Sequence, residues 1–169
     1  MEQITAQETN KLTFADYNNA MQPTWCPACG DFAIFMALKQ ALVALQIPPH
    51  QIFLVWGIGC SGNMSNWVNV YGVHSLHGRA LPVATGAKLV NPALTVITEG
   101  GDGDGYGIGL AHFIHAMRRN LDITYIVHNN LIYGLTTGQT SPTSEHGFKT
   151  RSTPCVVIEH PINPIALAL

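Results

Sequence analysis

Three short runs of consecutive apolar residues constrain the fold more than any other feature of this chain. The runs QIFLVWGIG, LTVITEGG and DITYIVHNN lie at residues 51–59, 94–101 and 122–130. Each run is continuous rather than alternating in polarity, which is typical of strands that are buried on both faces. Because stretches with helical spacing separate the runs, we expect right-handed βαβ units. The fold class predicted is α/β, with a parallel sheet and helices on both faces.

The stretches before and between these runs predict three helices. Residues 31–45 carry apolar side chains at helical spacing, and Asp31 is expected to cap the N-terminus of that helix. A second helix is expected from Pro82 to Asn91, and a third within residues 105–120. The loops that follow the strands hold the glycine clusters, and ligands of parallel sheets bind at that edge.

Composition and charge narrow the class of protein. The chain has 169 residues, of which 47% are hydrophobic and 11% charged, a composition typical of a globular protein. Its net charge of -2 does not resemble the basic surface that binds nucleic acid. No run approaches the roughly 18 apolar residues of a membrane span, and the N-terminus does not resemble a leader. We therefore expect a cytoplasmic protein that binds neither nucleic acid nor a membrane.

The domain organisation expected is a polar N-terminal arm at residues 1–24 and a single domain at residues 25–169. Near the end, Asn163 and Pro164 form a typical start of a helix. Because the chain stops at Leu169, that helix has little room to continue. We expect the complete protein to be longer.

The segment GGDGDG at residues 100–105 follows a predicted strand and precedes a predicted helix. We call it the diphosphate loop, because its backbone N–H groups can surround a diphosphate. Asp102 and Asp104 would repel a diphosphate unless a divalent cation stood between them, and carboxylates suit Mg²⁺. The next strand ends at Asn129 and Asn130, about 25 residues further on, which is the length of one helix plus one strand. A tight turn with surface aspartates is the simpler alternative for GDGD alone.

Four cysteines, Cys26, Cys29, Cys60 and Cys155, are too few for a disulfide-stapled domain. In a reducing compartment, the C-x-x-C pair at Cys26 and Cys29 predicts a zinc site, a redox dithiol or an iron–sulfur site. The pair by itself leaves these alternatives open.

Several other polar residues are expected to be structural. His112 and His115 on the third predicted helix are better interpreted as histidines at the edge of the core than as a metal site. Arg118 and Arg119 complement the dipole at the end of that helix. Glu99, which precedes the diphosphate loop, is interpreted as local structure.

Taken together, the motifs resemble the β subunit of 2-oxoacid:ferredoxin oxidoreductases, especially those acting on 2-oxoglutarate and related 2-oxoacids. The resemblance covers residues 25–169 and rests on the segments WCPACGD, GIGCS, HSLHGRALPVATGAK, GGDGDGYGIGLAHFIHAMRRN, NNLIYGLTTGQTSPTS and INPIALAL. It implies a thiamine diphosphate-binding fold. The Gly-Asp-Gly sequence followed by Asn-Asn matches the family's thiamine diphosphate motif.

The resemblance assigns roles to individual residues. Mg²⁺ is expected on Asp102, Asn130 and the backbone carbonyl of Ile132. The residues expected to line thiamine diphosphate are Ile58, Gly59, Cys60, Ser61, His77, Gly78, Gly103, Asp104, Gly134 and Leu135.

The resemblance also implies that Cys26, Cys29 and Cys60 are three of the four thiolates of a [4Fe–4S] cluster. The family's fourth ligand lies further along than this chain extends. Cys155 is then expected to be a buried structural thiol. The segment GLTTGQTSPTS is expected to cover the site as a lid, with Gly134 and Gly138 as pivots.

The activity that the resemblance implies is oxidative decarboxylation of a 2-oxoacid to acyl-coenzyme A, with electrons passed through the cluster to ferredoxin. The cofactor carries the chemistry, so no catalytic side chain is expected in this chain. An activating glutamate is expected from the α subunit, without which the chain is expected to be inactive. Two alternatives are a non-redox thiamine diphosphate carboligase or decarboxylase, and an inert fragment that only binds its α partner.

Overall fold

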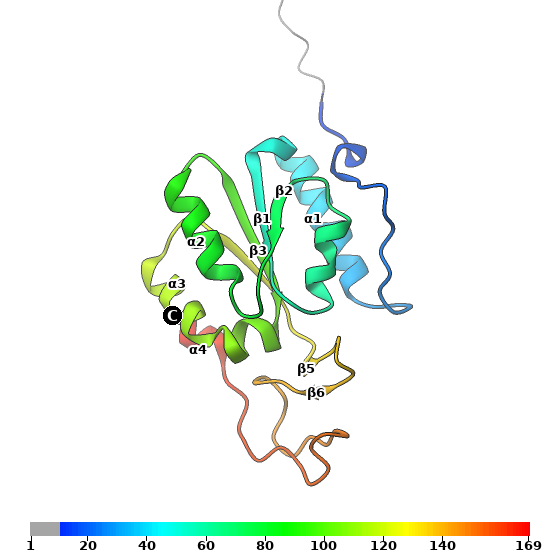
Figure 1. The fold of residues 1–169 in the computed structure, drawn as a ribbon, viewed down its shortest axis with the longest axis vertical. Coiled ribbons are helices and arrows are strands. Elements are labelled where there is room, and N and C mark those ends of the chain that lie inside the picture. The colour runs from blue at the N-terminus through cyan, green and yellow to red at the C-terminus, as the bar shows by residue number, and fades with distance from the viewer. Residues whose placement is uncertain (1–10) are drawn as a thin grey trace, which may run out of the picture.

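The structure, a computed structural model, describes residues 11–169, and the first ten residues of the expected arm lie outside the described residues. At its centre is a four-stranded sheet in the order β2-β1-β3-β4 (Figure 1). The strands are β1 (Ile52–Trp56), β2 (Tyr71–His74), β3 (Thr95–Gly101) and β4 (Thr124–His128). Every neighbouring pair is parallel, which confirms the predicted α/β class.

Strand β2 is the element that the sequence did not predict. It pairs with β1 at one edge of the sheet, and all four of its residues are exposed. An edge strand does not need a continuous apolar run, so the hydrophobic pattern does not reveal it. Gly72 lies so close to Leu54 and Trp56 of β1 that a side chain at this position would collide with them.

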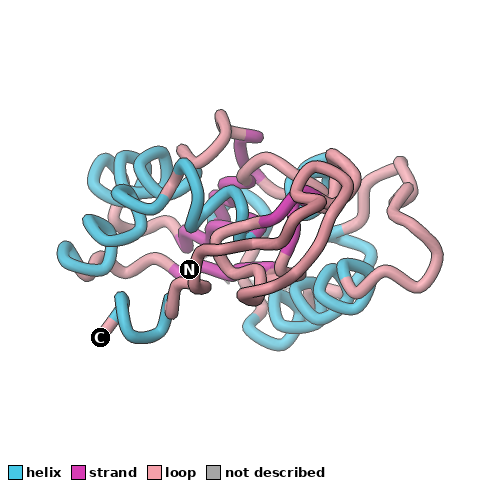
Figure 2. The backbone as a smooth tube through the Cα atoms, turned by 90° about the horizontal axis from the view of Figure 1, so that it is seen from below, coloured by secondary structure: helices cyan, strands magenta, loops and turns pink. Residues whose placement is uncertain are grey.

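Helices cover both faces of the sheet, as Figure 2 shows. On one face, α1 (Asp31–Leu45) packs Phe35, Leu38 and Leu42 against the β1 side chains that point to that face. On the other face lie α2 (Ala80–Val90) and α3 (Leu110–Arg119). The predicted arrangement of helices on both faces is therefore confirmed.

Several short helices and one hairpin lie outside the central sheet and its covering helices. The 3₁₀ helices are Phe14–Tyr17, Pro49–Gln51 and Ser61–Asn66, and a π-helical stretch spans Gly103–Ile108. The antiparallel hairpin of β5 (Ile132–Tyr133) and β6 (Gln139–Thr140) lies beyond one end of the sheet (Figure 1). The last helix is α4 (Pro164–Ala168), whose expected cap Asn163 accepts a hydrogen bond from the backbone of Ala166 at 3.1 Å. Among residues 11–169, no helix has both the length and the apolar character that crossing a membrane requires.

The helix boundaries differ from the prediction in three places. Gly30, not Asp31, occupies the N-cap of α1, because the Asp31 side chain is engaged elsewhere. α2 begins two residues before Pro82, which a first helical turn tolerates because its N–H groups have no partner there. α3 begins only at Leu110, because the glycine-rich stretch before it is π-helical and is broken at Gly107.

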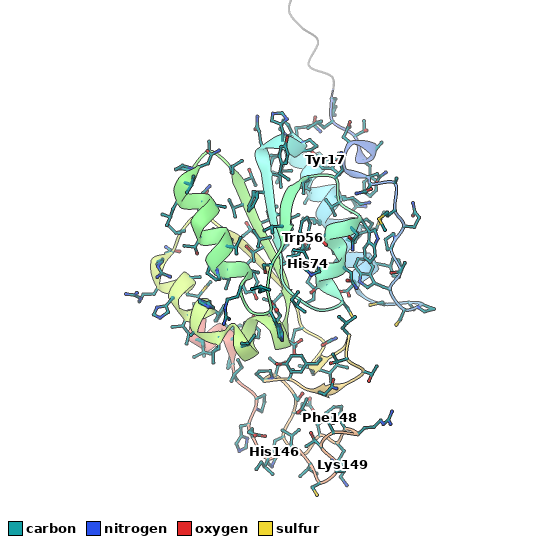
Figure 3. The ribbon with its side chains drawn as sticks, viewed as in Figure 1. Tyr17, Trp56, His74, His146, Phe148 and Lys149 are labelled. Carbon is teal, nitrogen blue, oxygen red and sulfur yellow. The ribbon has the colours of Figure 1, made fainter. Side chains whose placement is uncertain are left out.

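Tyr17 anchors the segment before α1 to the core (Figure 3). Its side chain is fully buried, and its hydroxyl shares one proton between the carbonyl oxygens of Ile47 at 2.7 Å and Leu42 at 3.1 Å. Those two carbonyls belong to the end of α1 and the turn after it. The phenol thus ties the N-terminal segment to the end of α1.

Replacing Tyr17 by phenylalanine tests this anchor. Because the hydrogen bond from the buried phenol to these carbonyls is lost, Tyr17→Phe should lower the free energy of unfolding by about 1–2 kcal/mol, measured by urea denaturation. The matched control is Tyr71→Phe on the exposed edge strand, which should change it by less than about 0.5 kcal/mol. Equal effects of the two substitutions would contradict the proposed anchor.

Candidate cofactor site

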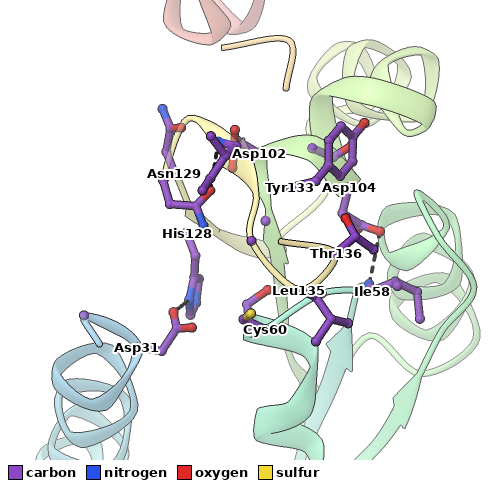
Figure 4. Close-up of a pocket in the computed structure, with 18 of the residues that line it drawn as sticks. Asp31, Ile58, Cys60, Asp102, Asp104, His128, Asn129, Tyr133, Leu135 and Thr136 are labelled. Carbon is purple, nitrogen blue, oxygen red and sulfur yellow. Dashed lines mark hydrogen bonds and ion pairs between the residues drawn. The ribbon is translucent and has the colours of Figure 1, made fainter. Parts of the chain in front are cut away.

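A cavity of about 320 Å³ opens at the carboxyl edge of the sheet, where the segments following β1, β3 and β4 meet (Figure 4). This volume lies at the small end of the range for ligand pockets. The structure brings twelve of the predicted residues together in its wall: Ile58, Gly59, Cys60, Ser61, His77, Asp102, Gly103, Asp104, Asn130, Ile132, Gly134 and Leu135. Cys29 lines it as well, whereas Gly78 and Cys26 do not.

Asp102 comes directly after β3 and is almost completely buried. One of its oxygens, Oδ2, accepts hydrogen bonds from Ser141 Oγ at 2.5 Å and Thr143 Oγ1 at 2.6 Å. Within residues 11–169, no hydrogen bond reaches the other oxygen, Oδ1. A carboxylate oxygen at the cavity is therefore available to a cation.

Asn130 lies at the start of the loop that leads into the β5–β6 hairpin. Its Oδ1 accepts a hydrogen bond from the backbone N–H of Ile132 at 3.1 Å. A Cβ atom on Gly134 would stand 2.8 Å from Asn130 Nδ2 and 3.7 Å from Cys60 Sγ. Asn130, Gly134 and Cys60 thus meet at one point of the cavity wall, and only glycine fits between the other two.

The hairpin is also joined to the diphosphate loop. The hydroxyl of Tyr133 donates to the carbonyl oxygen of Gly103 at 3.0 Å. The Tyr133 ring lies so close to Gly103 that a side chain there would collide with it. Burial, followed by the charges of Asp102 and Asp104, raises the pKa of Tyr133, so its hydroxyl keeps its proton and acts as a donor.

Asp104 is buried like Asp102, but protein groups surround its carboxylate. Its Oδ1 accepts from the backbone N–H of Ile58 at 3.0 Å, the backbone N–H of Gly78 at 2.8 Å and His77 Nδ1 at 2.6 Å. Three donors on one oxygen leave little room for a cation there, which indicates a structural role for Asp104. The pairing through Nδ1 leaves His77 Nε2 as the nitrogen that is free to meet a ligand.

Cys29 and Cys60 line the cavity, and Cys26 lies close enough to Cys60 to influence the pKa of its thiol. Burial raises the pKa of the Cys60 thiol, and the nearby charges of Asp31, Cys29 and Cys26 raise it further. The indole N–H of Trp25 donates to the carbonyl oxygen of Cys60 at 2.7 Å, which holds the C-x-x-C segment against the Cys60 loop.

Within residues 11–169, no three His, Cys, Asp or Glu side chains converge to hold a single metal ion. An iron–sulfur cluster does not need such convergence, because each thiolate binds a different iron.

The prediction that Cys155 is a buried thiol is wrong. Cys155 is exposed, in an irregular segment at residues 145–160 that projects away from the sheet together with His146, Phe148 and Lys149 (Figure 3). In the described part of the chain, this segment belongs to no helix or strand. His112 and His115 lie on α3 and do not line the cavity.

A buried polar network beside Cys60 was missed in the sequence. Asp31 Oδ1 and His128 Nδ1 are 2.7 Å apart, and Figure 4 shows the pair next to Cys60. Glu99 lies on the same face of the sheet and accepts from the indole N–H of Trp56 at 3.1 Å. Neither Glu99 Oε1 nor His128 Nε2 has a hydrogen-bond partner in the part of the chain that the structure describes. A charged residue, Glu99, inside a buried strand with no other charge was the signal available.

The comparisons with known proteins identify the class. Residues 57–169 match the family described as thiamine pyrophosphate enzyme, C-terminal TPP binding domain, and the chain belongs to that family.

Its relatives are more specific. The chain is 50% identical over 155 residues to subunit beta of 2-oxoacid:ferredoxin oxidoreductase 1 from Aeropyrum pernix, covering 92% of this chain and 49% of the relative. It is 46% identical over 154 residues to the 2-oxoglutarate oxidoreductase subunit KorB of Mycobacterium tuberculosis, covering 91% of this chain and 41% of the relative.

A solved structure is similar as well. It is a 2-oxoglutarate:ferredoxin oxidoreductase from Magnetococcus marinus with 2-oxoglutarate, coenzyme A and succinyl-CoA bound. The TM-score is 0.89 at 42% identity, and the match covers 94% of this chain and 54% of that chain. This chain spans about half the length of the curated relatives it matches.

The buried carboxyl of Glu99 should make the free energy of unfolding depend on pH. Burial raises the pKa of its carboxyl from 4.5 to about 7, against the opposing effects of His128 and Trp56. Between these two values the folded chain holds a proton that the unfolded chain has released. The free energy of unfolding should therefore fall by about 3 kcal/mol as pH rises through this window, and Glu99 should add no further change above it.

The comparison to make is urea unfolding of the protein and of Glu99→Gln at about pH 5 and about pH 8. The glutamine keeps the size of the side chain but cannot ionise, so the decline should be smaller in that variant by the same amount. Identical pH dependence in both proteins would contradict the raised pKa.

Proposed function

We propose that residues 25–169 form the thiamine diphosphate-binding domain of the β subunit of a 2-oxoacid:ferredoxin oxidoreductase. One observation carries the proposal: a single cavity joins Asp102 of the diphosphate loop, Asn130 and Cys60. A cofactor bound there would have the metal-binding carboxylate of Asp102 at one end and the thiol of Cys60 beside it. The similarity to β subunits of this family supports the same function.

The residues of the cavity fit Mg²⁺ and thiamine diphosphate. Asp102 Oδ1, Asn130 and the backbone carbonyl of Ile132 would hold the cation, an all-oxygen set that suits Mg²⁺. The glycines at positions 103 and 134 leave the backbone open where side chains would otherwise stand. His77 would meet the diphosphate region through Nε2, since Asp104 holds the opposite nitrogen. Thiamine diphosphate, when bound, supplies the nucleophilic carbon for decarboxylation of a 2-oxoacid.

The cysteines fit an electron-transfer role. Cys26, Cys29 and Cys60 would provide three ligands of a [4Fe–4S] cluster. Because the pKa of Cys60 is raised, loading a cluster has to displace a proton from this thiol. The fourth ligand would come from outside residues 11–169 or from a partner.

The partners proposed are the α subunit, coenzyme A, a 2-oxoacid such as 2-oxoglutarate or pyruvate, and ferredoxin. The solved relative, which holds 2-oxoglutarate and coenzyme A, supports the small-molecule partners. The α subunit would supply the activating glutamate. Glu99 does not suit that role, because its carboxyl is fully buried against Trp56 and it does not line the cavity.

Cys60 separates this function from its two rivals. In the chain assembled with its α subunit, Cys60→Ser should abolish coenzyme A-dependent reduction of a viologen dye by 2-oxoglutarate and by pyruvate, because an electron-relay ligand is lost. Calorimetry should show that the variant still binds thiamine diphosphate with Mg²⁺. The matched control is Cys155→Ser, which alters an exposed thiol and should leave both measurements unchanged.

The other outcomes identify the alternatives. If Cys60→Ser reduced the dye as fast as the unaltered protein, the cluster assignment would be wrong. If the unaltered protein consumed 2-oxoacid without reducing the dye, a non-redox decarboxylase or carboligase would be favoured. If the unaltered assembly bound no thiamine diphosphate, the chain would be an inert fragment that only binds its partner.

A further inference from the structure

A hydroxyl-rich segment, Ser141 to Ser144, is buried against the diphosphate loop. Each of its hydroxyl residues, Ser141, Thr143 and Ser144, is less than 10% exposed, although the segment directly follows the β5–β6 hairpin. The sequence indicated only a lid here. In the structure its residues form hydrogen bonds to Asp102 on one side and to Leu131 on the other.

Two of these hydroxyls donate to the same oxygen of Asp102. The distances to Oδ2 are 2.5 Å from Ser141 Oγ and 2.6 Å from Thr143 Oγ1. Thr143 Oγ1 also lies 3.1 Å from Asn129 Oδ1, but a hydroxyl has only one proton to donate. The shorter contact to the charged oxygen takes that proton, since charge-assisted hydrogen bonds are the stronger ones. Asp102 Oδ2 is therefore saturated by protein donors.

Ser144 connects the same segment to the loop that carries Asn130. Its hydroxyl donates to the carbonyl oxygen of Leu131 at 2.5 Å and accepts from the backbone N–H of Ser141 at 2.8 Å. Leu131 stands between Asn130 and Ile132, the two other groups proposed to hold the cation. One short segment thus fixes both the carboxylate and the loop opposite it.

The saturation of Oδ2 restricts how Asp102 can bind a cation. Only Oδ1 remains, so the carboxylate can act as a one-oxygen ligand but not as a two-oxygen ligand. Mg²⁺ forms a small octahedral shell and takes single carboxylate oxygens, whereas Ca²⁺ is larger and often takes both oxygens of one carboxylate. A carboxylate held in this way suits the smaller ion.

We propose that Ser141 and Thr143 are positioning residues that hold Asp102 as a one-oxygen ligand and thereby make the site selective for Mg²⁺ over Ca²⁺. This inference rests on the proposed function, because it assumes that a metal–diphosphate binds at Asp102. It adds that the selectivity lies in the hydroxyls behind the ligand and not in the ligand itself.

The test is calorimetric titration of thiamine diphosphate into the chain assembled with its α subunit, once with Mg²⁺ and once with Ca²⁺. Thr143→Val preserves the shape of the side chain and removes the hydroxyl. It should weaken Mg²⁺-supported binding about 10- to 100-fold, the usual effect of losing a group that orients a metal ligand. Ca²⁺-supported binding should weaken less, so that the preference for Mg²⁺ falls by about tenfold.

Two matched variants serve as controls. Thr143→Ser keeps the hydroxyl and should bind like the unaltered protein with both ions. Thr150→Val removes a hydroxyl that forms hydrogen bonds with Ser152 and the backbone N–H of Thr153, far from Asp102 in the sequence, and it should have no effect. Circular dichroism of the unloaded proteins checks folding, and Ser141→Ala gives the same measurement should Thr143→Val not fold.

The outcomes separate the inference from the proposed function. Equal weakening with both ions would overturn the selectivity, and unchanged binding in Thr143→Val would overturn the positioning role. If the unaltered assembly bound thiamine diphosphate with neither ion, the proposed function would fail and the role of both hydroxyls with it.

Discussion

The carboxylate of Asp104 is the constraint on which the rest of the site depends. It carries a buried negative charge, and the donors that compensate it come from the loop after β1 and from the turn before α2. A hydrogen bond to a charged group contributes about 1.5–3 kcal/mol, and a buried charge without partners is strongly destabilising. These contacts therefore hold the diphosphate loop and the two other segments at fixed positions, which is how loops far apart in the sequence share one cavity.

The groups around Asp102 and Asp104 determine whether each carboxylate can bind a cation. The two residues are identical in type, lie two positions apart and are both buried. Oδ1 of Asp104 is enclosed by two backbone N–H groups and an imidazole, and its Oδ2 lies so close to Gly57 that a side chain there would collide with it. Asp102 has two hydroxyl donors on Oδ2, and no hydrogen bond within residues 11–169 reaches its Oδ1. The donors around Asp104 hold the diphosphate loop in place, whereas those around Asp102 leave one oxygen for a cation.

The parts of the fold that could be predicted were those with a strong one-dimensional signal. Strands β1, β3 and β4 are continuous apolar runs, and the helices between them follow from apolar spacing, so the sequence pattern was sufficient for the α/β class. Strand β2 has no such run, because it lies exposed at an edge. Cys155 was expected to be a buried structural thiol, but it lies exposed in an irregular segment of the described chain.

In the site, too, only the residues with a local sequence signal could be predicted. Glycines and aspartates after a strand indicated the diphosphate loop, and the family resemblance indicated which residues would face the cofactor. Ser141 and Thr143 are about forty positions from Asp102, so no local spacing predicts that they meet it. The contact between Asp31 and His128 joins residues that are even further apart in the sequence. Such contacts depend on the folded arrangement of the loops and can be seen only in three dimensions.

The most direct measurement of the central claim is a crystal structure of the chain with the proposed α subunit, grown with thiamine diphosphate and Mn²⁺ in place of Mg²⁺. An anomalous difference map recorded with this ion locates the cation independently of any model. The account predicts a peak between Asp102 Oδ1, Asn130 and the carbonyl of Ile132, with the diphosphate on the loop after β3. A peak at another place, or a diphosphate bound away from Asp102 and Asn130, would contradict it.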